Sequence, residues 1–346
     1  MSINIIRGFL VLFVILGHWS TGILERLPAS LNFLSTALAP AFSMGTPGFS
    51  IIYGVGAGFS MYSIFQSDAV RLKRILHKTA LLLLSGIVML AMVNFWKTVT
   101  VVEVLTFTHF TNSFYSVLTY YLLITVTLYF WFSVISRSKY PAVFSLLLAI
   151  LFYTLHTFLI RDIGMSKAEG VVEFIKLLFT AKYSYFLMLT GTMSGISIGI
   201  FTRQLIDDRE PLSIYFLIGS AIMILGVVLS VHAGGGGNWF SWPIRYNYIW
   251  RWLFYVGVIL FMMAVIDSLL SGYDKYKGST KFIFQFFSVI GLLAFPLFIT
   301  HEMVLPVKTI LSFYGVPGSV ALGFPMAIFL IGTFFLFRKV YRLSFL

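Results

Sequence analysis

The segment LSIYFLIGSAIMILGVVLSV, residues 212–231, runs for twenty positions without a charged side chain. A helix of that length is about 30 Å long, which matches the hydrocarbon core of a bilayer. Similar apolar runs recur along the chain, and they predict an all-α, polytopic transmembrane bundle of about ten spans in one domain, residues 1–346. The predicted spans are 5–24, 46–65, 75–94, 114–135, 141–160, 183–201, 212–231, 249–271, 282–303 and 318–337.

The composition excludes a water-soluble domain. Hydrophobic residues make up 59% of the chain and charged residues 10%, whereas soluble domains carry about 25% charged residues. The net charge of +12 indicates no nucleic-acid partner, because the basic residues lie in short segments between apolar runs. The absence of cysteine excludes thiol nucleophiles and zinc–thiolate sites.

The distribution of Lys and Arg predicts the orientation. With the N-terminus inside, most of the 24 basic residues fall in cytoplasmic segments, as the positive-inside rule requires. We therefore expect a multi-pass protein of the plasma (inner) membrane with both termini in the cytoplasm.

Arg7 and His18 are polar residues within the first apolar run. Eleven residues at about 100° each bring a helix back to nearly the same face, so both side chains are expected to point the same way. Arg7 alone is typical of a topology signal or a snorkelling anchor, and His18 alone is typical of a helix–helix hydrogen bond. Their shared face favours a joint functional role.

A basic cluster, Arg71, Lys73 and Arg74, lies in the predicted first cytoplasmic loop. If this segment is helical, Arg71 and Arg74 stand one turn apart and can clamp phosphate groups. The alternative is that they only fix the topology.

His301 and Glu302 fall near the outer end of the predicted ninth span. A histidine at the depth of His18 suits a general-base site, and a histidine–carboxylate pair equally suits a proton relay. A third interpretation is that the span ends there and leaves both residues at the membrane interface. No group of residues has the pattern of a metal site.

Two other regions stay open. The aromatic outer loop, residues 232–252, is typical of a membrane-interface belt, although its flat rings also suit a sugar. His109 and His156 receive no assigned role.

These features together resemble the integral-membrane acyltransferase family 3, whose members transfer acyl groups from coenzyme A to sugars and other acceptors across the membrane. The resemblance covers essentially the whole chain. It is carried by the Arg7–His18 spacing, the glycine-rich aromatic segment 48–59, Arg71 with Arg74, segment 185–201, and the segment from Ser288 to His301.

The resemblance implies an O-acyltransferase that uses acyl-CoA, with acetyl-CoA as the expected donor and an extracytoplasmic glycan or lipid-linked sugar as acceptor. Acetylating and glucan-succinylating members are both candidates. His18 is the expected general base, and His301 with Glu302 would orient the acceptor or stabilise the oxyanion.

The donor-binding residues implied by the resemblance are basic. Arg71, Arg74 and Lys73 would hold the phosphates of coenzyme A, and Arg7 would line the route of its pantetheine arm. A covalent acyl-enzyme is not expected, because the chain has no cysteine and no Gly-x-Ser-x-Gly motif.

Two other classes of protein compete with this interpretation. The first is a proton-coupled secondary transporter using His18, His301 and Glu302. The second is a scaffold subunit of an envelope-polymer assembly without chemistry of its own.

Overall fold

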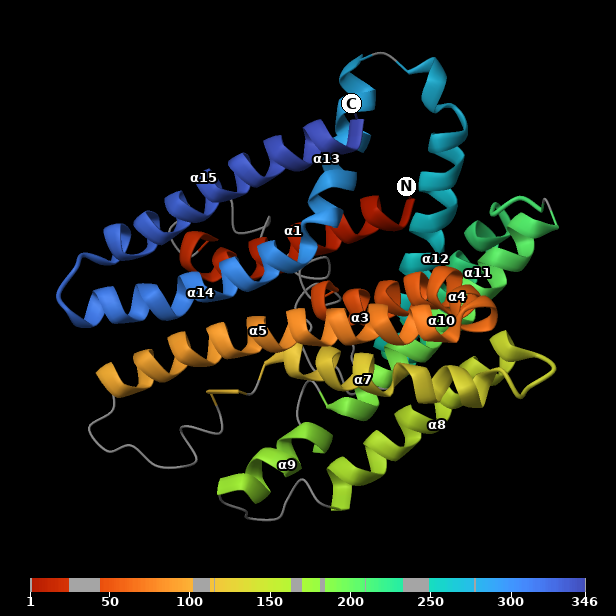
Figure 1. Ribbon diagram of the computed structural model, residues 1–346, viewed down its shortest axis with the longest axis horizontal. Helices are drawn as coiled ribbons and strands as arrows, with labels where there is room; N and C mark the ends of the chain where they lie inside the picture. Colours follow the sequence, from red (N-terminus) through yellow and green to blue (C-terminus); the bar gives the residue numbers. More distant parts are fainter. Residues whose placement is uncertain are drawn as a thin grey trace. The chain divides into compact units, whose positions relative to one another are not determined.

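The computed structural model describes residues 2–24, 44–101, 113–114, 116–162, 170–180, 184–208, 210–232, 249–276 and 278–345, and most of them are helical. A π-helical turn, η2 (Ala57–Met61), joins α3 to α4, and a 3-10 turn, η4 (Tyr273–Lys275), follows α12. The α-helices, labelled in Figure 1, are α1 (Ser2–Leu24), α3 (Gly45–Gly56), α4 (Tyr62–Ser67), α5 (Ala69–Val101), α7 (Val117–Ile135), α8 (Pro141–Asp162), α9 (Gly170–Thr180), α10 (Tyr185–Asp207), α11 (Ile214–His232), α12 (Ile249–Ser271), α13 (Gly278–Leu292), α14 (Ala294–Phe313) and α15 (Gly318–Phe345).

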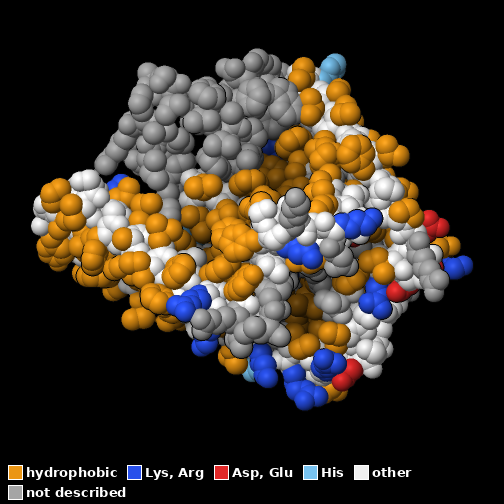
Figure 2. Space-filling model, turned by 90° about the horizontal axis from the view of Figure 1, so that it is seen from above, with side chains coloured by type: hydrophobic (Ala, Val, Ile, Leu, Met, Phe, Trp, Pro, Cys, Tyr) orange, Lys and Arg blue, Asp and Glu red, His pale blue; other side chains and the backbone are white. Residues whose placement is uncertain are grey.

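The predicted class is confirmed: this is an all-α, polytopic membrane protein. Within the described ranges, nine helical segments are long and apolar enough to cross a bilayer, and the apolar part of α1, Ser2–His18, is shorter. Large apolar side chains are exposed along many of these helices, and they dominate the face seen in Figure 2. Such a surface suits contact with lipid chains rather than water.

The predicted ninth span, 282–303, is wrong in its boundaries. Helix α13 ends at Leu292, Leu293 leaves the helical conformation (φ −86°, ψ 5°), and α14 continues to Phe313. Pro296 explains the break, because in a continuous helix its ring would clash with the carbonyl of Leu292. In the observed structure Pro296 falls in the first turn of α14, where a missing N–H costs little.

Helix α9 was not among the predicted elements. It has only 11 residues, too few to cross a bilayer. Glu173 and Lys176 pair across one turn at 3.7 Å, while Val171, Val172 and Ile175 are at least half exposed. Helix α9 is therefore amphipathic, with an apolar face open to its surroundings.

The chain divides into two compact units, each assembled from three separate stretches. Unit 1 comprises residues 1–66, 134–153 and 187–292, and unit 2 comprises residues 67–133, 154–186 and 293–346. One of the boundaries between them coincides with the helix break at Leu293.

Unit 1 is packed through glycines at its helix contacts. Cβ atoms added at Gly54 and Gly195 would meet the opposite backbone between α3 and α10: the Cβ of Gly54 would lie 2.9 Å from the Cα of Gly195. Gly219 and Gly257 allow a similar approach between α11 and α12, where a Cβ at Gly219 would lie 2.8 Å from the Gly257 carbonyl oxygen. Small residues are the usual means of close helix packing in membranes.

Unit 2 contains a second helix pair, α14 and α15, packed side by side. Gly315 (φ +81°) forms the turn between them, and the N–H groups of Gly315 and Val316 donate to the carbonyls of Ser312 and Leu311. This is the Schellman arrangement that ends a helix at a left-handed glycine. An apolar groove of about 350 Å³ lies between the two helices.

Candidate functional site

Arg7 and His18 both lie on α1, in unit 1, so the predicted helix that carries both residues is confirmed. Both side chains are partly buried. A Cβ added at Gly56 would lie 3.0 Å from Nη2 of Arg7. The guanidinium group of Arg7 therefore reaches α3 inside unit 1, in the space that Gly56 leaves open.

The segment beside Arg7 departs from regular α-helix. The π-helical turn η2 begins directly after Gly56, and Ser60 donates its hydroxyl to the Gly56 carbonyl at 2.7 Å. Arg203 of α10 lies with its guanidinium carbon 5.8 Å from the centre of the Phe59 ring. Short π-helical insertions are frequent at functional sites, and here one adjoins the glycine that contacts Arg7.

The basic cluster Arg71, Lys73 and Arg74 is helical, as phosphate clamping requires. It occupies the first turns of α5, not a loop, because only Asp68 separates α5 from α4. The carboxylate of Asp68 accepts the backbone N–H of Arg71 at 2.8 Å, which stabilises this helix start. All three basic side chains are exposed, and the ammonium of Lys73 lies 4.6 Å from the centre of the Tyr129 ring on α7.

His301 lies inside α14, not at the end of a span. Its side chain is fully buried, and α14 continues for twelve residues beyond it, to Phe313. This position contradicts the interpretation that the span ends at His301. The longer helix follows from the displaced boundary at Leu293.

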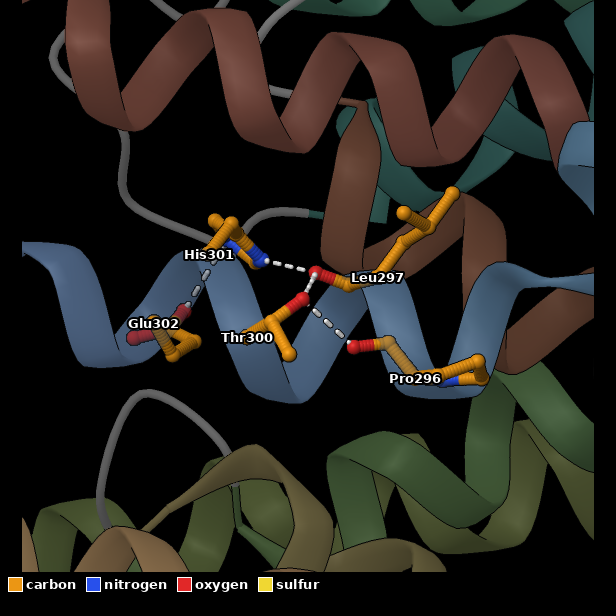
Figure 3. A network of polar contacts seen from close by, with 5 residues as sticks. All are labelled: Pro296, Leu297, Thr300, His301 and Glu302. Atoms are coloured by element: carbon orange, nitrogen blue, oxygen red, sulfur yellow. Dashed lines mark hydrogen bonds and ion pairs between the residues drawn. The ribbon is translucent and has the colours of Figure 1, made fainter. Parts of the chain in front are cut away.

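The contacts of His301 within α14 indicate which ring nitrogen carries the hydrogen. Figure 3 shows its ring beside the Leu297 carbonyl and the Glu302 carboxylate. Nδ1 lies 3.1 Å from the carbonyl oxygen of Leu297, and a carbonyl only accepts, so Nδ1 carries the hydrogen. Nε2 is then the basic nitrogen, and it lies 3.6 Å from Oε1 of Glu302. The Glu302 side chain is 29% exposed.

The predicted site residues thus lie on three helices. Arg7 and His18 share α1 in unit 1, and the structure places the basic cluster at the start of α5 and the His301–Glu302 pair on α14, both in unit 2. His109 and residues 233–248 of the aromatic loop lie outside the described residues.

One buried polar pair escaped the sequence reasoning. His156 of α8 and Ser184, directly before α10, are both fully buried, and Nδ1 of His156 lies 2.6 Å from Oγ of Ser184. The sequence holds no spacing signal for this contact, because the two residues are 28 positions apart on different elements.

Comparisons with protein-family models, curated proteins and solved structures find no match to this chain. The long apolar helices define its class, a polytopic α-helical membrane protein.

Proposed function

We propose that this protein is an acyl-CoA-dependent membrane O-acyltransferase. It transfers an acyl group, with acetyl as the first candidate, from cytoplasmic acyl-CoA to a hydroxyl of an extracytoplasmic glycan or lipid-linked sugar. The observation that carries the proposal is the position of Arg7. Arg7 shares α1 with His18, and its guanidinium lies against Gly56 of α3. A side chain that served only as a topology signal would extend toward water.

The donor has a polyanionic end, and the basic cluster supplies a matching surface. Arg71 and Arg74 stand one turn apart at the start of α5 and are exposed. Guanidinium groups bind phosphate through paired, charge-assisted hydrogen bonds, and a helix N-terminus adds favourable N–H dipoles. We assign the phosphates of coenzyme A to Arg71, Lys73 and Arg74, and the pantetheine arm to the region of Arg7.

The acceptor hydroxyl needs a base, and His18 is assigned that role. General-base catalysis contributes about 10²–10⁴-fold. His301, with Nδ1 fixed by the Leu297 carbonyl, is assigned to the acceptor or the developing oxyanion, and Glu302 would balance its charge.

The competing proposal is a proton-coupled transporter in which His18, His301 and Glu302 relay protons. The buried His301–Glu302 pair at 3.6 Å supports it, because ionisable pairs inside membrane helices are typical of proton paths. Release of coenzyme A separates the two functions, since a transporter does not cleave a thioester.

The experiment is a turnover assay with the full chain purified into lipid nanodiscs. Free thiol from acetyl-CoA and succinyl-CoA is followed with and without a crude glycan acceptor, and the absence of cysteine removes any background from the protein. We expect slow release that requires His18. If no donor is bound or cleaved in either condition, the acyltransferase proposal fails and the transporter becomes the better candidate.

A further inference from the structure

The pair formed by His156 and Ser184 has the geometry of a base and a nucleophile. The serine Oγ and the histidine Nδ1 are 2.6 Å apart, within the range of activated serines, and each side chain has 0% of its surface exposed. A serine hydroxyl gives its proton readily only when such a base accepts it. The serine O–H donates to Nδ1 when the neutral imidazole carries its hydrogen on Nε2, and this is the tautomer in which His156 can act as the base.

The position of Ser184 in the chain adds a second element of an acyl-transfer site. Ser184 directly precedes α10, a helix of 23 residues. The N-terminal end of a helix carries partial positive charge and N–H groups with no acceptor in the helix itself. An oxyanion that forms on a carbonyl attached to Oγ of Ser184 would develop at this stabilising end.

Tyr185, the next residue after Ser184 in the chain, makes polar contacts of its own within unit 2. The hydroxyl of Tyr185 lies 2.8 Å from Oγ1 of Thr127 on α7, and the indole N–H of Trp131 points to the same hydroxyl at 3.4 Å. Polar and aromatic groups of α7 therefore meet the residue that follows Ser184.

We propose that Ser184 is an acyl-accepting nucleophile activated by His156. Its Oγ attacks the carbonyl carbon of an acyl thioester while the hydroxyl proton passes to Nδ1 of His156. The C–S bond breaks, the thiolate takes that proton from the imidazolium and leaves as a thiol, and Ser184 holds the acyl group as an ester. In the second step His156 takes the proton of an acceptor hydroxyl as that oxygen attacks the ester carbonyl, and it returns the proton to Oγ of Ser184 as the ester C–O bond breaks. In this route the deprotonation that the proposed function assigns to His18 falls to His156.

Burial keeps water away from the pair. An ester shielded from water transfers its acyl group to a bound alcohol without competing hydrolysis. In the proposed orientation α8 ends and α10 begins at the outer side of the membrane, where the acceptor is expected. The identity of the donor rests on the proposed function, whereas the reactivity of Ser184 does not.

The first test uses diisopropyl fluorophosphate, a small apolar reagent able to reach a buried serine, on the full chain in nanodiscs. We expect one adduct on Ser184, mapped by peptide mass spectrometry, that is absent in Ser184→Ala and at least tenfold slower to form in His156→Gln. The matched control is Ser145→Ala, because Ser145 is equally buried but donates to the Met193 carbonyl at 2.8 Å with no base beside it. Ser145→Ala should label like the wild type.

A second variant covers the case in which Ser184→Ala or His156→Gln fails to fold. Ser184→Cys introduces the sole thiol of the chain, and a base within hydrogen-bond distance raises thiolate character. We expect this thiol to be alkylated by N-methylmaleimide at least tenfold faster than the thiol of Ser145→Cys. Equal rates, or no serine adduct in the wild type, would overturn the proposal.

An acid-quenched reaction with acetyl-CoA separates this inference from the proposed function. An acetyl ester on Ser184 supports both. Continued release of coenzyme A by Ser184→Ala, with no ester in the wild type, overturns the inference and leaves the acyltransferase intact. A reactive Ser184 with no coenzyme A release from either donor supports the nucleophile and overturns the proposed function.

Discussion

Helices α10 and α15 are both apolar enough to span a membrane, yet they are buried to very different extents. In the most apolar 18-residue stretch of each helix, 72% of the residues are buried inside the protein for α10, against 22% for α15. Helix α10 is buried through glycines and hydroxyl-bearing residues such as Gly195 and Ser194, whereas α15 exposes large side chains such as Phe334 and Phe335. Apolar composition places a helix in the membrane, and small residues decide which helices reach the interior.

The largest effect is expected from a large side chain at Gly195 of α10. A Cβ there would lie 2.7 Å from the Val55 nitrogen and 2.8 Å from the Gly54 Cα, so Gly195→Leu should prevent α3 and α10 from packing and leave no folded protein. Size-exclusion chromatography and thermal unfolding in detergent measure the outcome. The matched control is Gly323→Leu on α15, where an added Cβ meets nothing within 4 Å. Equal stability of the two variants would contradict the packing described for α10.

The second prediction concerns His18 of α1, in unit 1. His18→Ala should lower acyl transfer by about 10²–10⁴-fold, the contribution of a general base, with little change in the unfolding temperature. The assay is coenzyme A release by the protein in nanodiscs. Leu16→Ala, at a 48% exposed position of the same helix, serves as the control. If the two variants turn over equally fast, His18 is not the base.

A smaller effect is expected at the basic cluster of unit 2. Replacing both Arg71 and Arg74 with Ala should raise the apparent acyl-CoA constant at least tenfold, or about 1.4 kcal/mol, with little effect on folding because both side chains are exposed. Donor titration of turnover measures this shift. The double variant Arg338→Ala and Lys339→Ala removes two other exposed charges, on α15. If this control variant raises the apparent acyl-CoA constant as much, the effect comes from general positive charge and not from a phosphate clamp.

The smallest expected effect has the opposite sign. Gly323→Ala should stabilise the protein by about 0.5–1 kcal/mol, because alanine restricts the unfolded chain and the position is open. The unfolding temperature should therefore rise slightly. A clear fall would show that Gly323 contacts another segment and that α15 is less exposed than described.

The sequence predicted the helical class and nearly every span, because long apolar runs have few alternatives to crossing a bilayer. It misplaced the ninth span because hydropathy stays high across residues 282–303 and hides the effect of Pro296. The proline alone was a weak signal, because α14 continues through Pro306 and α15 continues through Pro325. Helix α9 was missed because an 11-residue amphipathic helix falls below the length that marks a membrane span.

The candidate site was predictable only where it is local in sequence. Arg7 with His18, and Arg71 with Arg74, follow from helical periodicity alone. The pairing of Ser184 with His156 does not, because it depends on how the end of α8 meets the start of α10. Tertiary contacts of this kind leave no periodic pattern in a single sequence.

The hydrogen bond from His301 to the Leu297 carbonyl has a consequence for how this protein can vary. Its acceptor is main chain, so replacing the side chain at position 297 does not remove it while α14 stays helical. Substitutions at position 297 are therefore expected to leave the tautomer of His301 unchanged. Related chains with the same tautomer are expected to keep the helix and its histidine. They need no particular side chain at position 297.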